Sequence, residues 1–409
     1  MPLLPHLRYF IPQSYLDSDA VYTGFIIAFP VMLPQIYSFF DWKRLEFLSF
    51  GSYDVILTGN KILAMSLIIP EGYRNILGSL ENTEKAIKAV KDMFQENLSA
   101  QLALLRVTAP MFVMSGMGLN DDLNGVESPV SFPVKGMGGA QAEIVHSLAK
   151  WKRMKLAGMN VAPGRGIYTD MNAIRPEEEP DNLHSIYVDQ WDWEKVITKE
   201  DRTLEYLKKT VRRIYEAVKV TENKLFVEFP QITPMLPEDV FFIHAEELLR
   251  MYPDMSPKDR ENAVTREHGA VFIIGIGGRL SDGNPHDGRS ADYDDWSTVN
   301  EEGSVGLNGD LLLWNPVLET AFEISSMGIR VDSEALSRQL EARGETSKSG
   351  LLYHKLLLEG KLPYTIGGGI GQSRLCMFLL RKAHIGEIQS SVWPEWMKEE
   401  CRLAGVDLV

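Results

Sequence analysis

The spacing of apolar residues predicts helices in several parts of the chain. From Asn82, a candidate helix cap, apolar residues recur every three or four positions, at Ile87, Val90, Phe94 and Leu98. Residues 200–229 carry the same kind of stripe and predict a second long amphipathic helix. A third helix is predicted over residues 140–154, and a surface helix over residues 348–360.

Short apolar or alternating runs predict strands between these helices. One pair stands out, because an extended run from Tyr168 reaches Arg175, a polar loop follows, and an alternating run returns over residues 184–193. Further strands are predicted at residues 104–109, 111–113, 241–244, 271–275, 311–314 and 322–326.

A glycine-rich stretch, Gly367-Gly368-Gly369-Ile370-Gly371, separates an apolar strand from an apolar helix. It predicts a tight strand-to-helix turn with Arg374 on the first turn of the helix. Gln372 stands where a dinucleotide fingerprint needs its last glycine, and the stretch lacks the lysine of a Walker loop. A turn without a ligand is the alternative, but an arginine placed against apolar sequence favours an anion site.

Composition and charge narrow the function classes. The 409 residues are 44% hydrophobic, which is enough for a large core. A formal net charge of −14 argues against general binding to nucleic acid or membrane surfaces. The two cysteines, Cys376 and Cys401, give neither a disulfide framework nor a zinc spacing, so we expect a reducing compartment and a cytoplasmic protein.

Residues 1–64 differ from the rest of the chain. Val21 to Phe40 contains no charged residue and just reaches the length of a membrane span, but Pro30 and Pro34 interrupt it. We expect residues 1–64 to be an extension that is poorly ordered or non-native, and residues 65–409 to form the catalytic domain. A membrane anchor in the extension is the alternative, and without it we expect no membrane association.

Several polar residues are candidates for chemistry. Arg175, at the mouth of its loop, could bind a phosphate. Asp121 and Asp122 could orient an ammonium group or act as a base, although capping of a turn is an equal alternative. Asp310 and Glu323 border apolar runs and are candidate magnesium ligands, the alternative being charges at strand ends that face water.

Three of these pieces resemble motifs of class II aminoacyl-tRNA synthetases. The helix, strand and Pro110 resemble the first motif, which builds the dimer interface, and Arg175-Pro176-Glu177 with its loop resembles the second. The glycine stretch with Arg374 resembles the third, except that Ser373 replaces the usual acidic residue. Five longer segments are similar to the ammonia-dependent asparagine synthetase (aspartate–ammonia ligase) family. They are residues 146–153, 187–194, 292–296, 325–330 and 366–375. The resemblance as a whole runs from about Gly72 to Pro394.

This resemblance implies an α+β fold with a mostly antiparallel sheet flanked by helices, in a homodimer. The implied reaction converts L-aspartate, ATP and ammonia to L-asparagine, AMP and diphosphate through β-aspartyl-AMP, with Mg²⁺. The alternative is an aspartyl- or asparaginyl-tRNA synthetase, but the chain lacks a basic anticodon-binding domain, so we expect no nucleic-acid partner. Neither cysteine is placed as the nucleophile of a glutamine-using site, which favours free ammonia.

The resemblance also assigns roles to individual residues. The implied catalytic residues are Asp121, with Asp122 as a rival, Arg175 and Arg374. The implied aspartate pocket consists of Ser147, Lys152, Gln190, Asp192, Asp294 and Arg330. The implied ATP site consists of Arg175, Glu177, Ser326, Gly367, Gly368, Gly369, Gly371 and Arg374. The implied magnesium ligands are Asp310 and Glu323.

Overall fold

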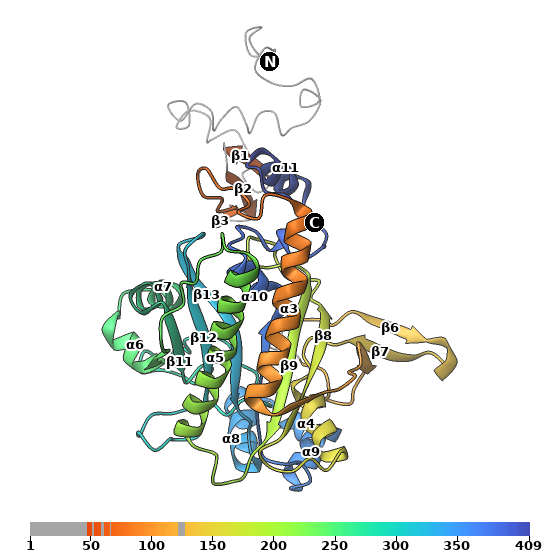
Figure 1. Cartoon of the computed structure of the whole chain (residues 1–409). Coiled ribbons are helices and arrows are strands. Elements are labelled where there is room, and N and C mark those ends of the chain that lie inside the picture. Colours follow the sequence, from red (N-terminus) through yellow and green to blue (C-terminus); the bar gives the residue numbers. More distant parts are fainter. Residues whose placement is uncertain (1–46, 51–52, 59–60, 66, 122–126) are drawn as a thin grey trace, which may run out of the picture. The chain divides into compact units, whose positions relative to one another are not determined.

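A computed structural model of the chain describes residues 47–50, 53–58, 61–65, 67–121 and 127–409 (Figure 1). The chain divides into two compact units, Met1–Ile68 and Ile69–Val409. In the described part of the first unit, three strands form an antiparallel sheet in sequence order: β1 (Phe47–Phe50), β2 (Tyr53–Thr58) and β3 (Lys61–Met65). The apolar run Val21 to Phe40 lies outside the described residues.

The second unit is built on an eight-stranded sheet of order β10-β11-β12-β13-β14-β9-β8-β4. Only the β10–β11 and β4–β8 pairs of this sheet are parallel, which confirms the predicted α+β fold with a mostly antiparallel sheet. Its strands are β4 (Leu104–Arg106), β8 (Gly166–Ile174), β9 (Tyr187–Val196), β10 (Phe241–His244), β11 (Ala270–Ile274), β12 (Asn308–Asn315), β13 (Thr320–Ile329) and β14 (Thr365–Gly371).

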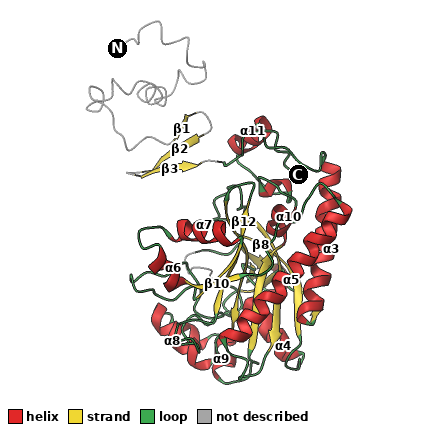
Figure 2. Ribbon diagram, turned by 60° about the vertical axis from the view of Figure 1, so that its left-hand side comes forward, coloured by secondary structure: helices red, strands yellow, loops and turns green. Residues whose placement is uncertain are grey.

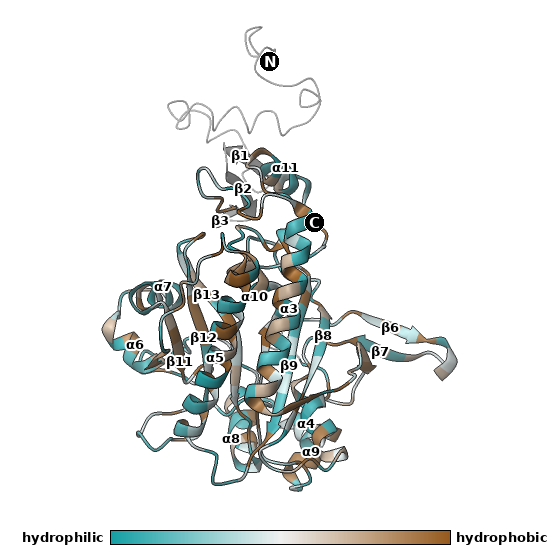
Figure 3. Cartoon of the chain, in the orientation of Figure 1, coloured by the Kyte–Doolittle hydropathy of each residue, from teal (hydrophilic) through white to brown (hydrophobic). Residues whose placement is uncertain are grey.

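Two long helices, α3 (Leu80–Leu102) and α5 (Leu204–Glu228), lie side by side against one face of this sheet (Figure 1). Hydrophilic and hydrophobic residues are mixed along both helices (Figure 3), and the predicted apolar stripes are their buried faces. Phe94 of α3 packs on Trp191 of β9 with ring centroids 4.7 Å apart. The predicted cap is wrong by one turn, because the Ser79 side chain caps α3 by accepting the backbone N–H of Asn82.

The remaining helices complete the layers around the sheet (Figure 2). Lys152 of α4 reaches Asp192 of β9, whereas the neighbouring Trp191 points to α3, so α4 covers the face opposite α3 and α5. These helices are α4 (Ala149–Gly158), α6 (Ala245–Met251), α7 (Pro257–His268), α8 (Ser333–Arg343), α9 (Leu352–Leu358), α10 (Gln372–Leu379) and α11 (Glu395–Leu403). None of the helices in the described part of the chain is long and apolar enough to cross a membrane.

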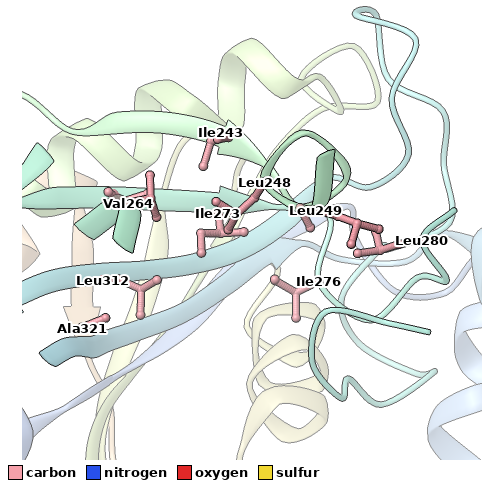
Figure 4. Packing of buried hydrophobic residues seen from close by; sticks show 11 residues of the cluster. Ile243, Leu248, Leu249, Val264, Ile273, Ile276, Leu280, Leu312 and Ala321 are labelled. Carbon is pink, nitrogen blue, oxygen red and sulfur yellow. The ribbon is translucent and has the colours of Figure 1, made fainter. Parts of the chain in front are cut away.

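A core cluster fills the space between α6, α7 and the strands at one end of the sheet. Ile273 of β11 and Leu312 of β12 lie together with Leu248 of α6 and Val264 of α7 (Figure 4). All four side chains are buried, so this end of the sheet is anchored by apolar packing.

The helix predicted over residues 140–154 is wrong in its first half. Residues Ala140–Ile144 form strand β7, which pairs with β5 (Phe112–Met114) and β6 (Ser131–Val134) in a separate three-stranded sheet. β6 precedes β7 by a short connection and β5 is distant in sequence, and the hydrogen bonds of both override the local helical pattern. The helix itself starts only at Ala149.

The predicted glycine turn is also wrong, because Gly367, Gly368, Gly369 and Gly371 lie within strand β14. None of the four has a positive φ, so a turn does not explain them. A side chain at Gly367 would overlap the Glu194 carboxylate, and one at Gly369 would overlap the Gln190 amide. Gly367 and Gly369 are therefore explained by side chains of β9, and Gly368 by its close approach to Met327 of β13.

The predicted surface helix over residues 348–360 is partly wrong. A short 3₁₀ turn (Thr346–Gly350) precedes α9, and Tyr353, His354 and Leu357 of α9 are buried. One face of α9 therefore packs against the body of the second unit.

Candidate active site

A cavity of about 480 Å³ opens on the face of the sheet that carries α4. Its walls come from α4, β9, β13, β14 and the loops around residues 121, 175 and 289. Most of the predicted site residues line it together, although they come from distant parts of the sequence. They are Asp121, Ser147, Lys152, Arg175, Glu177, Gln190, Asp192, Asp294, Glu323, Ser326, Arg330, Gly368, Gly369, Gly371 and Arg374.

One wall of the cavity holds a buried lysine–aspartate pair. Lys152 Nζ lies 2.6 Å from Asp192 Oδ1 and donates to the Gly368 carbonyl at 3.1 Å. Burial lowers the pKa of Lys152, and the neighbouring Asp192 and Glu194 carboxylates oppose that shift. The backbone N–H of Leu148 also donates to Asp192, which holds this carboxylate in place.

A second buried network centres on Arg330. Its guanidinium makes a bidentate contact with Glu194, with Nη2 at 2.8 Å from Oε2, and also bonds Asp294. Burial raises the pKa of Glu194, but Arg330 and then Lys152 outweigh this, and the pKa is lowered. Two carboxylates thus hold Arg330 at the cavity wall.

Two further arginines are less constrained. In the described part of the chain, Arg175 forms no ion pair with a carboxylate, and its Nε is buried without a hydrogen-bond partner. Arg374 is about a quarter exposed; its Nη1 donates to the Glu323 carbonyl at 3.3 Å and lies 3.7 Å from the Glu323 carboxylate. These two cations are therefore available to an anion in the cavity.

Asp121 also lines the cavity and is buried. His146 Nδ1 lies 3.2 Å from its carbonyl oxygen, and Asp121 adds to burial in raising the pKa of Tyr293. The rival residue Asp122 lies outside the described residues.

Two predicted residues do not line the cavity. Gly367 packs against Glu194 and Arg330 behind it. Asp310 is buried, and its Oδ1 lies 2.5 Å from Arg289 Nη2 and 2.7 Å from Ser326 Oγ. Burial raises the pKa of Asp310 to about 6; Arg289 opposes the rise and the Glu323 carboxylate adds to it.

Comparison with known proteins shows the family to which the chain belongs. A profile of the aspartate–ammonia ligase family matches residues 81–405. The chain belongs to the aspartate–ammonia ligase family. A member from Parabacteroides distasonis is 60% identical over 343 residues, covering 84% of this chain and 99% of that protein. One from Clostridium perfringens is 56% identical with the same coverage.

Solved structures of aminoacyl-tRNA synthetases share the fold of this family member. Asparaginyl-tRNA synthetase from Pyrococcus horikoshii, complexed with asparaginyl-adenylate, has a TM-score of 0.58 and 14% identity, covering 86% of this chain and 94% of that one. The Entamoeba histolytica enzyme in complex with asparaginyl-adenylate has a TM-score of 0.56 and 13% identity, covering 80% of this chain and 74% of that one. This likeness confirms the predicted class II synthetase-like fold.

Two residues of this aspartate–ammonia ligase family member were missed by the sequence reasoning. Glu194 continues the period of two set by Gln190 and Asp192 along β9, so strand alternation could have placed it on the same face. Arg289 bonds Asp310 and Ser326 and lies 3.5 Å from Asp294. It is the one lysine or arginine in the acid-rich stretch Ser281 to Asp295, which was a usable signal.

Proposed function

We propose that this chain catalyses the ATP-dependent amidation of L-aspartate by ammonia. The observation that carries the proposal is one cavity that combines two loosely held arginines, Arg175 and Arg374, with a buried set of cations and carboxylates suited to an amino acid. Membership of the aspartate–ammonia ligase family supports the substrates, and neighbours solved with asparaginyl-adenylate support adenylate chemistry on this fold. The wall with the buried ion pairs suits the aspartyl half of an aspartyl-adenylate. The wall with Arg175 and Arg374 suits its adenylate half.

The reaction has two steps. A β-carboxylate oxygen of aspartate attacks the α-phosphorus of ATP, forming a new P–O bond as diphosphate leaves. Ammonia then attacks the β-carbonyl carbon, and AMP leaves with the electron pair of the C–O bond. The attacking nitrogen loses one proton, for which Asp121 in the cavity is our candidate acceptor.

Aspartate presents two carboxylates and one ammonium, and we assign them to the buried networks. Arg330 and Lys152 are the cations for its carboxylates, and Asp192 and Asp294 are acceptors for its ammonium. Ser147 and Gln190 complete the pocket with neutral hydrogen-bonding groups. Because Arg330 and Lys152 are already held by carboxylates, the pocket is preorganised before aspartate binds.

The nucleotide is assigned to the other wall. Arg175 would bind the α-phosphate as its charge develops, and Arg374 the outer phosphates. Glu177 and Ser326 supply polar contacts, and the bare backbone of Gly368, Gly369 and Gly371 lets the nucleoside lie against β14. Gly367 serves this site indirectly, by leaving room for Glu194 and Arg330.

We also propose that Mg²⁺ accompanies ATP, held by Glu323 and Asp310. The two carboxylates are close enough for Glu323 to raise the pKa of Asp310, which fits a shared cation. No group of three or more potential ligands occurs among the described residues, so phosphate oxygens and water would complete the coordination. When bound, Mg²⁺ would neutralise phosphate charge.

We further propose a homodimer in the cytoplasm. Strand β4 is an edge of the large sheet, and Leu105 on it is more than half exposed, as is Phe112 on the nearby β5. Exposed apolar residues of this kind at a sheet edge favour pairing with a second copy. Both cysteines are free and buried, as in proteins of reducing compartments.

The reaction is tested by measuring AMP release from ATP and aspartate with ammonium chloride, with glutamine, and with added tRNA. We expect release and asparagine formation with ammonium chloride, little of either with glutamine, and no stimulation by tRNA. Release that required tRNA would instead indicate an aminoacyl-tRNA synthetase. Equal rates with glutamine and ammonium would contradict the proposed nitrogen donor.

We propose that residues 65–409 carry this function and that residues 1–64 are dispensable for it. The Parabacteroides relative matches 343 residues here with 99% of its own length, and the second compact unit spans Ile69–Val409. A chain starting at Met65 is therefore expected to keep kcat and both KM values within about twofold, since it retains every residue of the cavity. Assays of the two chains side by side check this, and a tenfold loss in the shorter chain would assign a role to the extension.

A further inference from the structure

Asp189, which the proposed reaction does not use, connects three elements at the edge of the cavity. It is buried at the start of β9, where Oδ2 lies 3.0 Å from Lys91 Nζ of α3 and Oδ1 accepts the backbone N–H of Ser373 at 2.9 Å. Figure 1 shows α3, α10 and β9 next to one another. A single carboxylate thus links the first turn of α10 to a core strand and a long helix.

Helix α10 has no carboxylate of its own at this end. Its N-cap residue is Gly371, which has no side chain, and its first turn contains no acidic residue. The first N–H groups of a helix need acceptors and favour a nearby negative charge. Asp189 supplies both from the neighbouring strand.

The first turn of α10 carries Arg374, the arginine assigned to the outer phosphates. The Arg374 side chain runs back over Gly371, where an added Cβ would lie 3.1 Å from Arg374 Cβ. Its guanidinium then meets β13 through the Glu323 carbonyl. The direction of Arg374 therefore depends on where the α10 backbone begins, which is the point that Asp189 holds.

We propose that Asp189, itself held by Lys91, is a positioning residue that fixes the start of α10 and so aims Arg374 at the phosphates of the nucleotide. The proposal rests on the proposed function, because it assigns the Lys91–Asp189 pair to the ATP half of that reaction. Asp192 and Lys152, on the opposite face of β9, belong to the aspartate half. Loss of the pair therefore affects one substrate and spares the other.

The test is Asp189→Asn in the full-length protein, with kcat and KM measured separately for ATP and for aspartate. Asparagine keeps an oxygen for the Ser373 N–H but loses the charge that pairs with Lys91 and favours the helix start. Since a small misplacement of a positioning group costs up to about 100-fold, we expect kcat to fall about 10- to 100-fold. The KM for ATP should rise several-fold, and that for aspartate should stay within twofold. Equal changes in both KM values, or unchanged constants, would overturn the proposal.

Lys91→Met separates positioning from direct contact. Asp189 borders the cavity but Lys91 does not. If Asp189 acted only by contacting the substrate, Lys91→Met would therefore have the kinetic constants of the wild-type protein. We expect Lys91→Met to change the same constants in the same direction but by less. Wild-type constants in Lys91→Met would contradict the paired arrangement, and this variant alone carries the test if Asp189→Asn does not fold.

Two controls complete the design. Asp239→Asn removes the exposed pair with Arg212 by the same chemical change outside the cavity, and wild-type constants are expected. Wild-type protein is assayed in parallel with ammonium. If it forms no asparagine, the proposed function fails; if it is active and both variants match it, only the positioning role fails.

Discussion

Arg374→Ala is expected to lower kcat by about 10²- to 10³-fold, because it removes a cation that stabilises charge developing on the phosphates. Arg374 makes one long contact with a carboxylate and one backbone hydrogen bond, so its guanidinium is largely available to a ligand. A partly exposed pair of this kind contributes at most about 1 kcal/mol to folding. The thermal unfolding midpoint should therefore change little while turnover falls.

The measurement is single-turnover formation of AMP from ATP and aspartate, which isolates adenylate formation from the later attack of ammonia. Arg374→Lys is the informative companion, since lysine keeps the charge but loses the planar, two-pronged donor. Arg402→Ala, in an exposed pair with Glu399 on α11, is the matched control and should behave as wild type. Near-normal turnover in Arg374→Ala would remove this residue from the mechanism.

The sequence predicted the long helices and the central strands because their patterns persist over several turns or residues. The stripe from Ile87 to Leu98 is the buried face of α3, and the run at 311–314 lies in β12. The helix predicted over residues 140–144 is wrong because these residues form the middle strand of a sheet, between the adjacent strand at 131–134 and the distant strand at 112–114. Pairing on both sides of the strand outweighed local preference there.

The glycine stretch shows what local reasoning lacks. Its pattern fits a turn or a strand equally well, and what selects glycine is the position of Glu194 and Gln190 on a strand about 175 residues earlier. Asp310 is similar, since its main partner is Arg289 and not a feature of its own strand. The resemblance named most of the residues that line the cavity. The ion pairs that hold their side chains could be identified only from the structure.

The Arg330 network shows how the fold turns such charges into both stability and function. Arg330→Met would leave the carboxylates of Glu194 and Asp294 in the buried wall without their guanidinium. Removing one partner of a buried ion pair costs about 3–5 kcal/mol, so we expect a clear fall in the free energy of unfolding. We also expect asparagine synthesis to be lost, because the variant lacks the cation assigned to an aspartate carboxylate.

A second substitution distinguishes these two effects. Glu194→Met together with Arg330→Met removes Arg330 with one of its two carboxylates and leaves Asp294, which still lies 3.5 Å from Arg289, so part of the lost stability should return. Chemical denaturation should therefore place the double variant closer to wild type than Arg330→Met, while asparagine synthesis stays absent. Recovery of activity with stability would mean that Arg330 acts only through the fold. Loss of synthesis in a stable double variant would support the assignment of Arg330 to the substrate, since the protein would then be folded but would lack the cation assigned to an aspartate carboxylate.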